Sequence, residues 1–380
     1  DTAASWFESQ LRSSEGASAR AYVDKRGLSE ATVKKFRLGL APDHRTLIKE
    51  ALGARGFTEE QMIETGLLIK PEEGEAYARF RDRLIFPISD GQGRIVGFGG
   101  RALGEARAKY LNSPETPLFH KGRLLYNLRN ARAKARDADR LIVVEGYMDV
   151  IALAQAGFEE SVAPLGTAVT EEQIELLWRI TPEPVLCFDG DQAGERAAER
   201  AALRALPGLK PGQSLRFALL PQGEDPDSLI ANQGRGAMRK VLDEAQTLID
   251  LLWEIELNRQ PADTPERRAG LRSRLFELCG PIGDETVRRF YRDEFLRRFD
   301  EKFARPAQSP GDRSRARTRQ GGFGDFRPSV SQELKRTMLA QSAVPASAGR
   351  DRLILKTLLA HPLLLDEMEE EIAALDLQEA

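Results

Sequence analysis

Between residues 140 and 220 the chain alternates short apolar runs with helical patterns, and this alternation restricts the fold more than any other feature. The four runs are RLIVVE at 140–145, SVAPL at 161–165, PVLCF at 184–188 and SLRFALL at 214–220. Helical periodicity fills the intervals at 147–157, 171–180 and 192–205, and Thr170 and Gln173 are spaced as a capping box. Apolar strands that alternate with helices are typical of a parallel sheet covered on both faces. We therefore predict an α/β fold with a parallel, doubly wound sheet.

Acidic side chains follow three of these four runs. Glu145 ends the first run, Asp189 and Asp191 follow the third, and Asp225 and Asp227 come just after the fourth. Ligands of such sheets bind at the carboxyl ends of the strands, near the point where the strand order reverses. Residues i and i+2 of an extended segment point the same way, so each D-x-D pair is expected to present both carboxylates to one ion. We predict that these five carboxylates are metal ligands.

The ligand chemistry favours a hard divalent cation. Oxygen ligands without His or Cys select Mg²⁺ or Mn²⁺ over zinc. Asp149, one turn into the following helix, is a further ligand candidate or a support for the others. Taken alone, DGDQAG at 189–194 also fits an ordinary Asp/Gly turn with a helix cap, but five converging carboxylates would repel strongly without cations. Three histidines and no C-x-x-C pair argue against a structural zinc site in these residues.

The rest of the chain divides by composition. Helical patterns precede two strands at 83–89 and 94–98, a helical stretch covers 228–303, and 306–331 reads as a disordered linker of Pro, Gly, Ser and Arg. GFGGRA at 97–102 only superficially resembles a dinucleotide fingerprint, because no convincing helix follows it. The expected parts are a basic α+β subdomain at 1–136, the metal-binding domain at 137–222, a helical subdomain at 223–304, the linker at 305–332 and the start of another helical domain at 333–380.

Charge is distributed unevenly along the chain. The total is −3, yet residues 1–136 hold 24 Lys and Arg side chains against 17 Asp and Glu. This favours a polyanion bound by the first part and metal held by the middle, although an uneven solvated surface is the alternative. Arg79, Arg81 and Arg83 alternate along a stretch that reads as strand, so we expect all three on one face open to solvent or ligand. The chain shows no apolar run of ~20 residues and no signal peptide, which predicts a cytosolic protein that spans no membrane.

The acidic motifs resemble those of a known fold. VVEGYMDVIALAQAGF, CFDGDQAGERAA and LPQGEDPDSLI are similar to the three motifs of the toprim fold of primases, topoisomerases and related nucleases. KYLNSPETPLFHKGRLLYNL, RFRDRLIFPI and GRIVGFGGR then resemble the RNA-polymerase core of bacterial DNA primases, from about residue 5 to 300. The zinc-binding domain of that family does not occur in these residues. We expect these residues to include only the opening of that family's helicase-binding domain, from about residue 333, and we therefore expect binding of single-stranded DNA and metal without a stable helicase complex.

The resemblance implies a DNA-directed RNA polymerase that makes short RNA primers on single-stranded DNA from ribonucleoside triphosphates. It would use Mg²⁺ or Mn²⁺, work in the cytoplasm at the replication fork, and meet the replicative helicase through the C-terminal domain of the full-length protein. The implied catalytic residues are Glu145, Asp189, Asp191, Lys109 and Lys121. The implied nucleic-acid and nucleotide contacts are Arg26, Arg79, Arg81, Arg101, Lys109, Asn112 and Lys121.

Three rival functions use similar carboxylates. A topoisomerase needs a tyrosine nucleophile on a DNA-gate domain, which these residues do not suggest. A toprim nuclease would lack the KYLNSPETPLFHKG segment at 109–122. An inactive scaffold that only docks DNA and helicase is disfavoured because every carboxylate is intact.

Overall fold

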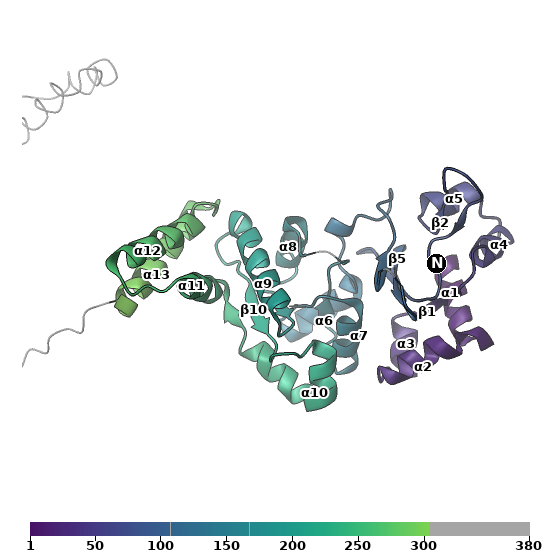
Figure 1. Cartoon of the computed structure of the whole chain (residues 1–380), viewed down its shortest axis with the longest axis horizontal. Helices are drawn as coiled ribbons and strands as arrows, with labels where there is room; N and C mark the ends of the chain where they lie inside the picture. The colour runs from purple at the N-terminus through teal and green to yellow at the C-terminus, as the bar shows by residue number, and fades with distance from the viewer. Residues whose placement is uncertain (107, 167, 304–380) are drawn as a thin grey trace, which may run out of the picture. The chain divides into compact units, whose positions relative to one another are not determined.

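The computed structural model describes residues 1–303 apart from 107 and 167, and this part belongs to one compact unit (Figure 1). The linker expected at 305–332 and the helical segment expected at 333–380 lie outside the described residues. The boundaries expected near 136 and 222 fall inside the compact unit and stay predictions. Among the described helices, none combines the length and the apolar character needed to cross a membrane.

A five-stranded sheet forms the centre of the unit, in the order β11-β10-β9-β7-β8. Its strands are β7 (Ile142–Val143), β8 (Ser161–Val162), β9 (Val185–Phe188), β10 (Arg216–Leu219) and β11 (Gln246–Thr247). The first four are parallel, which confirms that the four apolar runs form a parallel sheet. The short strand β11 pairs antiparallel with β10 at the edge, so the expectation of helix throughout 228–303 is wrong at this point.

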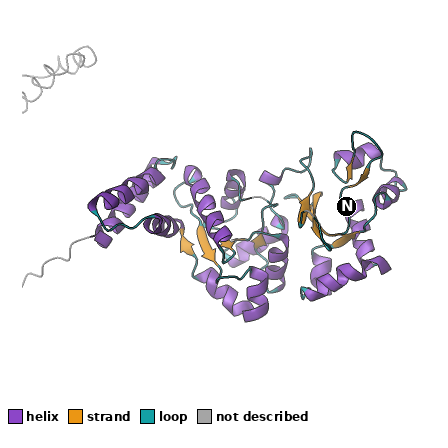
Figure 2. Cartoon of the chain, viewed as in Figure 1, coloured by secondary structure: helices purple, strands orange, loops and turns teal. Residues whose placement is uncertain are grey.

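Helices cover both faces of this sheet, as the prediction of a doubly wound fold requires (Figure 2). Ile142 and Cys187 pack with residues of α7 and α10, while Val143 and Leu186 pack with residues of α6, α8, α9 and α11. The strand period of two sends neighbouring side chains to opposite faces, so each strand contributes to both cores. The helices are α6 (Leu128–Ala138), α7 (Tyr147–Gln155), α8 (Glu171–Trp178), α9 (Gln192–Ala205), α10 (Pro226–Asp243) and α11 (Leu248–Arg259).

An antiparallel sheet, in the order β1-β4-β5-β6, organises the N-terminal part. Its strands are β1 (Gly39–Ala41), β4 (Arg83–Ser89), β5 (Ile95–Ala102) and β6 (Tyr110–Asn112), and a separate pair joins β2 (Leu68–Ile69) to β3 (Tyr77–Ala78). The helices are α1 (Thr2–Arg12), α2 (Ala17–Lys25), α3 (Glu30–Lys35), α4 (Leu47–Gly53) and α5 (Glu59–Glu64). The GFGGRA stretch lies within β5 rather than in a strand-to-helix turn, which agrees with its rejection as a dinucleotide fingerprint.

Two long helices, α12 (Pro265–Cys279) and α13 (Glu285–Phe303), complete the described chain. Thr264 caps α12 by accepting a hydrogen bond from the backbone N–H of Arg267, with Pro265 in the first turn. The capping box predicted for α8 is also present, because the Thr170 hydroxyl accepts from the backbone of Gln173 and the Gln173 side chain accepts from that of Thr170. Both helix starts were therefore predicted correctly from local spacing.

Aromatic rings join the antiparallel sheet to the central sheet. Tyr147, at the start of α7, stacks on Phe86 of β4 with centroids 5.0 Å apart and packs edge-on against Tyr126 at 4.8 Å. Its hydroxyl donates a 2.7 Å hydrogen bond to Oδ1 of Asn112 in β6. One apolar core then runs from Leu84 and Phe86 to the strands and helices of the central sheet. The two sheets are therefore expected to unfold together.

Replacing Phe86 tests this coupling. We expect Phe86→Ala to lower the free energy of unfolding by about 3–5 kcal/mol, because the buried ring leaves a cavity between the two sheets. Urea titrations followed by far-UV circular dichroism and by tryptophan fluorescence should shift together in one transition. Phe57→Ala is the control, since Phe57 is 42% exposed and its loss should cost little. Separate transitions for the two probes would contradict the coupling.

Candidate metal centre

The carboxyl edge of the central sheet has its switch point between β7 and β9. From β7 the chain passes through α7 to β8 on one side, and β9 then pairs on the other side of β7. Glu145 follows β7 and Asp189 follows β9. These two carboxylates therefore lie at the carboxyl ends of neighbouring parallel strands, where ligands of such sheets bind. The pKa of Glu145 is raised by partial burial and by the nearby Asp191, while the backbone N–H of Asp189 and the charge of Arg200 oppose the rise.

Several of the predicted carboxylates lie close enough to affect one another's pKa, in addition to the larger effect of burial. Burial raises the pKa of Asp189 to about 7, and the charges of Glu145, Asp225 and Asp191 add to the rise. Burial likewise raises the pKa of Asp149 to about 8, with contributions from Asp189 and Asp225. These raised pKa values mean that the protein alone does not fully stabilise the charged form of the carboxyl groups. A divalent cation with oxygen ligands fits this set of side chains, because it would offset the repulsion.

Helix N-termini anchor three of the six predicted ligands. Asp191 is the N-cap of α9, and its Oδ1 accepts from the backbone N–H groups of Ala193 at 2.8 Å and Gly194 at 2.7 Å. Asp225 caps α10 in the same way, accepting from the N–H of Ser228 at 2.7 Å. Asp149 accepts from the N–H of Gly146 at 2.9 Å, ahead of α7. The alternative reading of DGDQAG as a capped turn is thus correct as local structure, and the same carboxylate is also part of the acidic cluster.

The expected alignment of each D-x-D pair is wrong for Asp225 and Asp227. Asp225 is an N-cap and Asp227 already lies in the first turn of α10, so the rule for extended segments does not apply to them. Asp227 instead pairs with Arg26 of the loop after α2, with 2.5 Å between Nη1 and Oδ2. Within residues 1–303, leaving out 107 and 167, no three acidic, His or Cys side chains are arranged to hold one ion as they stand. The ligand assignment therefore stays a prediction.

Two loops meet tightly beside the cluster. The backbone N–H of Gly190 donates to the carbonyl of Glu224 at 3.1 Å, and the N–H of Gly223 donates to the carbonyl of Gly190 at 2.9 Å. A Cβ on Gly190 would lie 2.0 Å from the carbonyl oxygen of Pro221. The sequence requires glycine here because the loops after β9 and β10 approach each other through their backbones.

Arg101 is held between two tyrosines close to the acidic cluster. Its guanidinium carbon lies 4.5 Å from the ring centroid of Tyr22 and 5.7 Å from that of Tyr110. Arg26 also lies over Tyr22, and its Nε donates to the Tyr22 hydroxyl at 3.0 Å. Sequence reasoning predicted the two arginines and missed the tyrosines, since Tyr22 and Tyr110 carry no local signal that would mark them.

Two other predicted contacts are engaged within the protein. Arg79 donates through Nε and Nη2 to the backbone carbonyl of Asn112, at 3.1 and 3.0 Å. The Asn112 side chain donates to the carbonyl of Leu165 at 2.8 Å and accepts from Tyr147. These hydrogen bonds hold the side chains of Arg79 and Asn112 in place. Any contact that they make with nucleic acid would therefore start from these fixed conformations.

The expectation of three arginines on one open face is wrong. Strand β3 ends at Ala78, and Asp82 adopts a positive φ of 48°, so residues 79–83 are not one strand. Arg83 is buried and donates to the carbonyls of Gly100 at 3.1 Å and Ala108 at 3.0 Å. A buried arginine is accommodated here because main-chain carbonyls satisfy its donors.

The remaining predicted cations are accessible. Arg81 and Lys109 are exposed, Lys121 is partly exposed, and none of the three forms an ion pair in the part of the chain that the structure describes. The backbone carbonyl of Lys121 accepts from the Gln173 side chain at 3.0 Å, which ties this segment to the start of α8.

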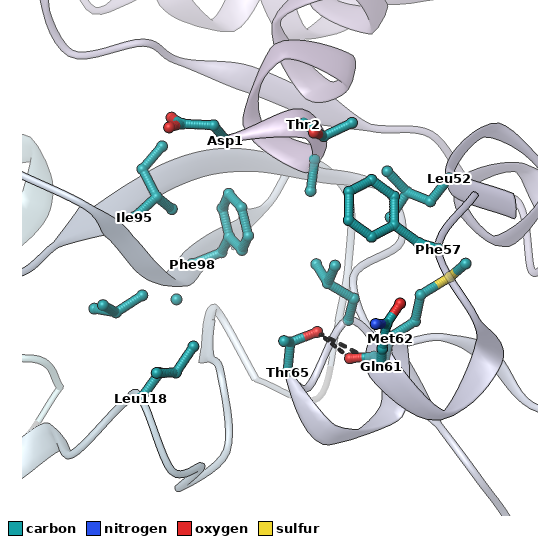
Figure 3. A pocket seen from close by; sticks show the side chains of 14 residues that line it. Asp1, Thr2, Leu52, Phe57, Gln61, Met62, Thr65, Ile95, Phe98 and Leu118 are labelled. Atoms are coloured by element: carbon teal, nitrogen blue, oxygen red, sulfur yellow. Dashed lines mark hydrogen bonds between the residues drawn. The ribbon is translucent and has the colours of Figure 1, made fainter. Parts of the chain in front are cut away.

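A separate cavity of about 320 Å³ lies between α1, α4, α5 and β5 (Figure 3). Figure 3 shows that Phe57, Met62, Phe98 and Leu118 line it. No predicted site residue takes part in this cavity, and its lining is mostly apolar. It therefore has no evident role in the chemistry of the acidic cluster.

Two family models match this chain. The N-terminal domain of the DNA primase catalytic core matches residues 6–132, and the toprim domain matches residues 139–213. A solved Pseudomonas aeruginosa DNA primase domain is 42% identical to this chain and superposes on it with a TM-score of 0.73. The match covers 82% of this chain and 96% of that domain. The chain belongs to the bacterial DNA primase family. The resemblance inferred from the motifs is thereby confirmed, as is the toprim-type fold.

Other members of the primase family are similarly related. The Escherichia coli K12 DNA primase is 42% identical over 289 residues, which are 76% of this chain and 50% of that protein. The chain thus spans about half the length of this curated relative. A structure described as the DnaG primase catalytic domain bound to single-stranded DNA is 41% identical, covers 77% of this chain, is covered to 95%, and has a TM-score of 0.71.

The two aspartates after β9 should differ in their effect on stability. We expect Asp189→Ala to leave the melting temperature unchanged or raise it in EDTA, because it removes a repelled carboxylate. Asp191→Ala should lower the free energy of unfolding by about 0.5–2 kcal/mol, because α9 loses its N-cap. Differential scanning calorimetry distinguishes the two. Equal destabilisation by both changes would contradict this division of roles.

The ion pair between Arg26 and Asp227 should compete with metal for the carboxylate. We expect Arg26→Ala to bind Mn²⁺ more tightly than the unchanged chain in isothermal titration calorimetry, because Asp227 loses its cationic partner. Lys25→Ala is the matched control, since it removes the same charge from the neighbouring exposed position. An Mn²⁺ affinity that is no higher for Arg26→Ala than for Lys25→Ala would contradict the competition.

Proposed function

We propose that this chain is a DNA-directed RNA polymerase core that synthesises short RNA primers on single-stranded DNA for replication. The reaction is nucleotidyl transfer, in which a primer 3′-oxygen bonds to the α-phosphorus of a ribonucleoside triphosphate and pyrophosphate leaves. The observation that carries the proposal is the acidic cluster at the switch point of a toprim sheet, in a chain of the primase family. Two related primase domains have been solved with DNA, one with single-stranded DNA and one with double-stranded DNA that carries an overhang. These complexes support DNA as the template.

The acidic residues would hold Mg²⁺ or Mn²⁺, with two or more ions per site. The ligands are Glu145, Asp189, Asp191, Asp225 and Asp227, with Asp149 as ligand or support. When bound, such ions would activate the attacking oxygen and neutralise the triphosphate. Glu145 and Asp191 are the exposed members of the acidic cluster, and Glu145 can serve as ligand or general base. The helix caps restrict Asp191 and Asp225 to one rotamer each, which limits the reorganisation needed on binding.

The basic residues would bind and orient the polyanions. Lys109 and Lys121 are accessible amines that can orient a triphosphate, and Arg81 offers an exposed guanidinium to a template phosphate. Arg26 pairs with Asp227, and Arg101 lies over the same Tyr22 ring as Arg26, so both suit the phosphates nearest the reaction. Arg79 and Asn112 hold the neighbouring strand in place and bind from that fixed position.

The cellular setting follows from family membership as part of the same proposal. The protein would act in the cytoplasm at the replication fork, and the full-length protein would meet the replicative helicase through the domain that begins near residue 333. Ribonucleoside triphosphates are the substrates and the RNA primer is the product.

A product assay tests the proposal. The chain is incubated with single-stranded template, labelled ribonucleotides and Mg²⁺ or Mn²⁺, and we expect short RNA. Asp189→Ala should reduce synthesis at least a hundredfold while the protein stays folded, and Asp43→Ala, an exposed aspartate outside the cluster, should have no effect. Relaxed circles, cut strands or no product would point to a topoisomerase, a nuclease or a scaffold. An Asp189→Ala protein that still makes primers at millimolar Mg²⁺ would refute the ligand assignment.

A further inference from the structure

Arginine and phenylalanine side chains are interleaved along the α12–α13 pair. Four guanidinium groups lie over three phenylalanine rings, with 5.0–5.5 Å between the guanidinium carbon and the ring centroid. We call this set the Arg–Phe track: Arg268 over Phe303, Arg272 and Arg292 over Phe276, and Arg289 over Phe290. None of these residues belongs to the acidic cluster or to the predicted groove.

The arginines of the track differ from four other arginines of the same helices in their charge partners, whereas Arg288 of α13, which lies outside the track, also has no ion pair among the described residues. Four neighbours pair with carboxylates at 2.6–2.8 Å: Arg267, Arg274, Arg297 and Arg298. Arg268, Arg272, Arg289 and Arg292 form no ion pair within the described residues. The positive charge beside the rings is therefore not offset by carboxylate partners of these four arginines, and Arg288 adds to it in the second hollow.

The track is open to solvent and is hollowed on both sides of Phe276. One hollow of about 620 Å³ includes Arg268 and Phe303, another of about 570 Å³ includes Arg289 and Arg292, and Phe276 lines both. Phe290 has 61% of its surface exposed. Two carboxylates also line the second hollow, those of Glu285 and Asp293, and they moderate the charge there.

The dimensions and the chemistry suit a nucleic-acid strand. Arg289 and Phe303 are 14 residues apart on α13, which is close to four full turns, so they lie on one face about 21 Å apart along the helix, long enough for several nucleotides. Single strands bind where cations follow the phosphates and aromatic faces stack the bases, and arginine contributes to both. Figure 1 shows α12 and α13 beyond α11, so a strand bound here would lie outside the acidic cluster.

We propose that the Arg–Phe track is a second binding surface for the single-stranded DNA template. The inference rests on the proposed function, because a template continues beyond the catalytic centre whatever the length of the primer. The track would hold that outlying part of the strand. The arginines would contact phosphates, while Phe276 and Phe290 would stack on bases.

The test measures how the full chain binds fluorescein-labelled oligothymidylates of increasing length. The variant is Arg272→Gln with Arg292→Gln, since both side chains are exposed and form no ion pair among the described residues. For long oligonucleotides we expect weaker binding and a log–log salt slope smaller by roughly 1.4, because each lost phosphate contact of a single strand removes about 0.7. Oligonucleotides too short to reach the track from the groove should bind the variant and the unchanged chain nearly equally.

A matched control separates the track from general charge. Arg267→Gln with Arg297→Gln removes the same two charges from the same helices but outside the track, and it should leave the affinity and the slope nearly unchanged. Phe290→Leu keeps an apolar side chain and should weaken binding about fivefold or more, because one stacked base is lost. Circular dichroism melts verify that all variants are folded.

Four outcomes would overturn the inference. In the first, the track variant binds like the control at every length. In the second, both variants bind more weakly by the same factor, which would indicate general electrostatics. RNA of the same length and sequence can show the larger loss, which would assign the track to the product. The track can also prove indifferent to nucleic acid while synthesis is intact, which would fit an acidic protein partner. Primer synthesis on a short template is measured in parallel, because its absence in the unchanged chain would refute the proposed function independently of these affinities.

Discussion

Repulsion among carboxylates at one edge of the central sheet is the constraint on which the rest of the structure depends. Burial raises the pKa values of Asp149, Asp189 and Glu145, and the neighbouring carboxylates raise them further, so these charges are costly to hold together. Helices α7, α9 and α10 begin at this edge, and their N-terminal N–H groups bind three of the carboxylates. The partial positive charge of each helix start offsets part of the repulsion. The protein alone therefore stabilises the charged carboxylates only in part, and a bound cation would stabilise them further.

The central sheet is also where the two halves of the unit are joined. Tyr147 follows Glu145 by two residues, stacks on Phe86 and bonds to Asn112. Any shift of the antiparallel sheet would move Tyr147 and with it the start of α7. The residues expected to bind nucleic acid and those expected to bind metal are thus coupled through Tyr147, in addition to the ion pair between Arg26 and Asp227.

Local patterns predicted much of this molecule, and long-range contacts explain what they missed. The apolar runs, the capping box at Thr170 and the acidic residues after three of the runs are visible in short stretches of sequence, and the rule for strand ends in parallel sheets predicts that the acidic residues meet. The ion pair between Arg26 and Asp227 joins positions 201 residues apart, and no periodicity signals it. Arg83 was expected to be open because guanidinium groups usually are, but main-chain carbonyls brought close by β5 and its loop satisfy it. The edge strand β11 consists of the polar residues Gln246 and Thr247, so it lacks the apolar run that marks the other strands of the sheet.

The backbone hydrogen bonds between the loops after β9 and β10 also bear on how such a chain can vary over evolution. Gly190 bonds to Glu224 and accepts from Gly223, so neither loop can gain or lose a residue without breaking the register of the other. Length changes in relatives should therefore be rare in both loops and should accumulate elsewhere, for example in the exposed turn at 72–75 between β2 and β3. In an alignment, these two loops would stand out by their constant length even where their side chains differ.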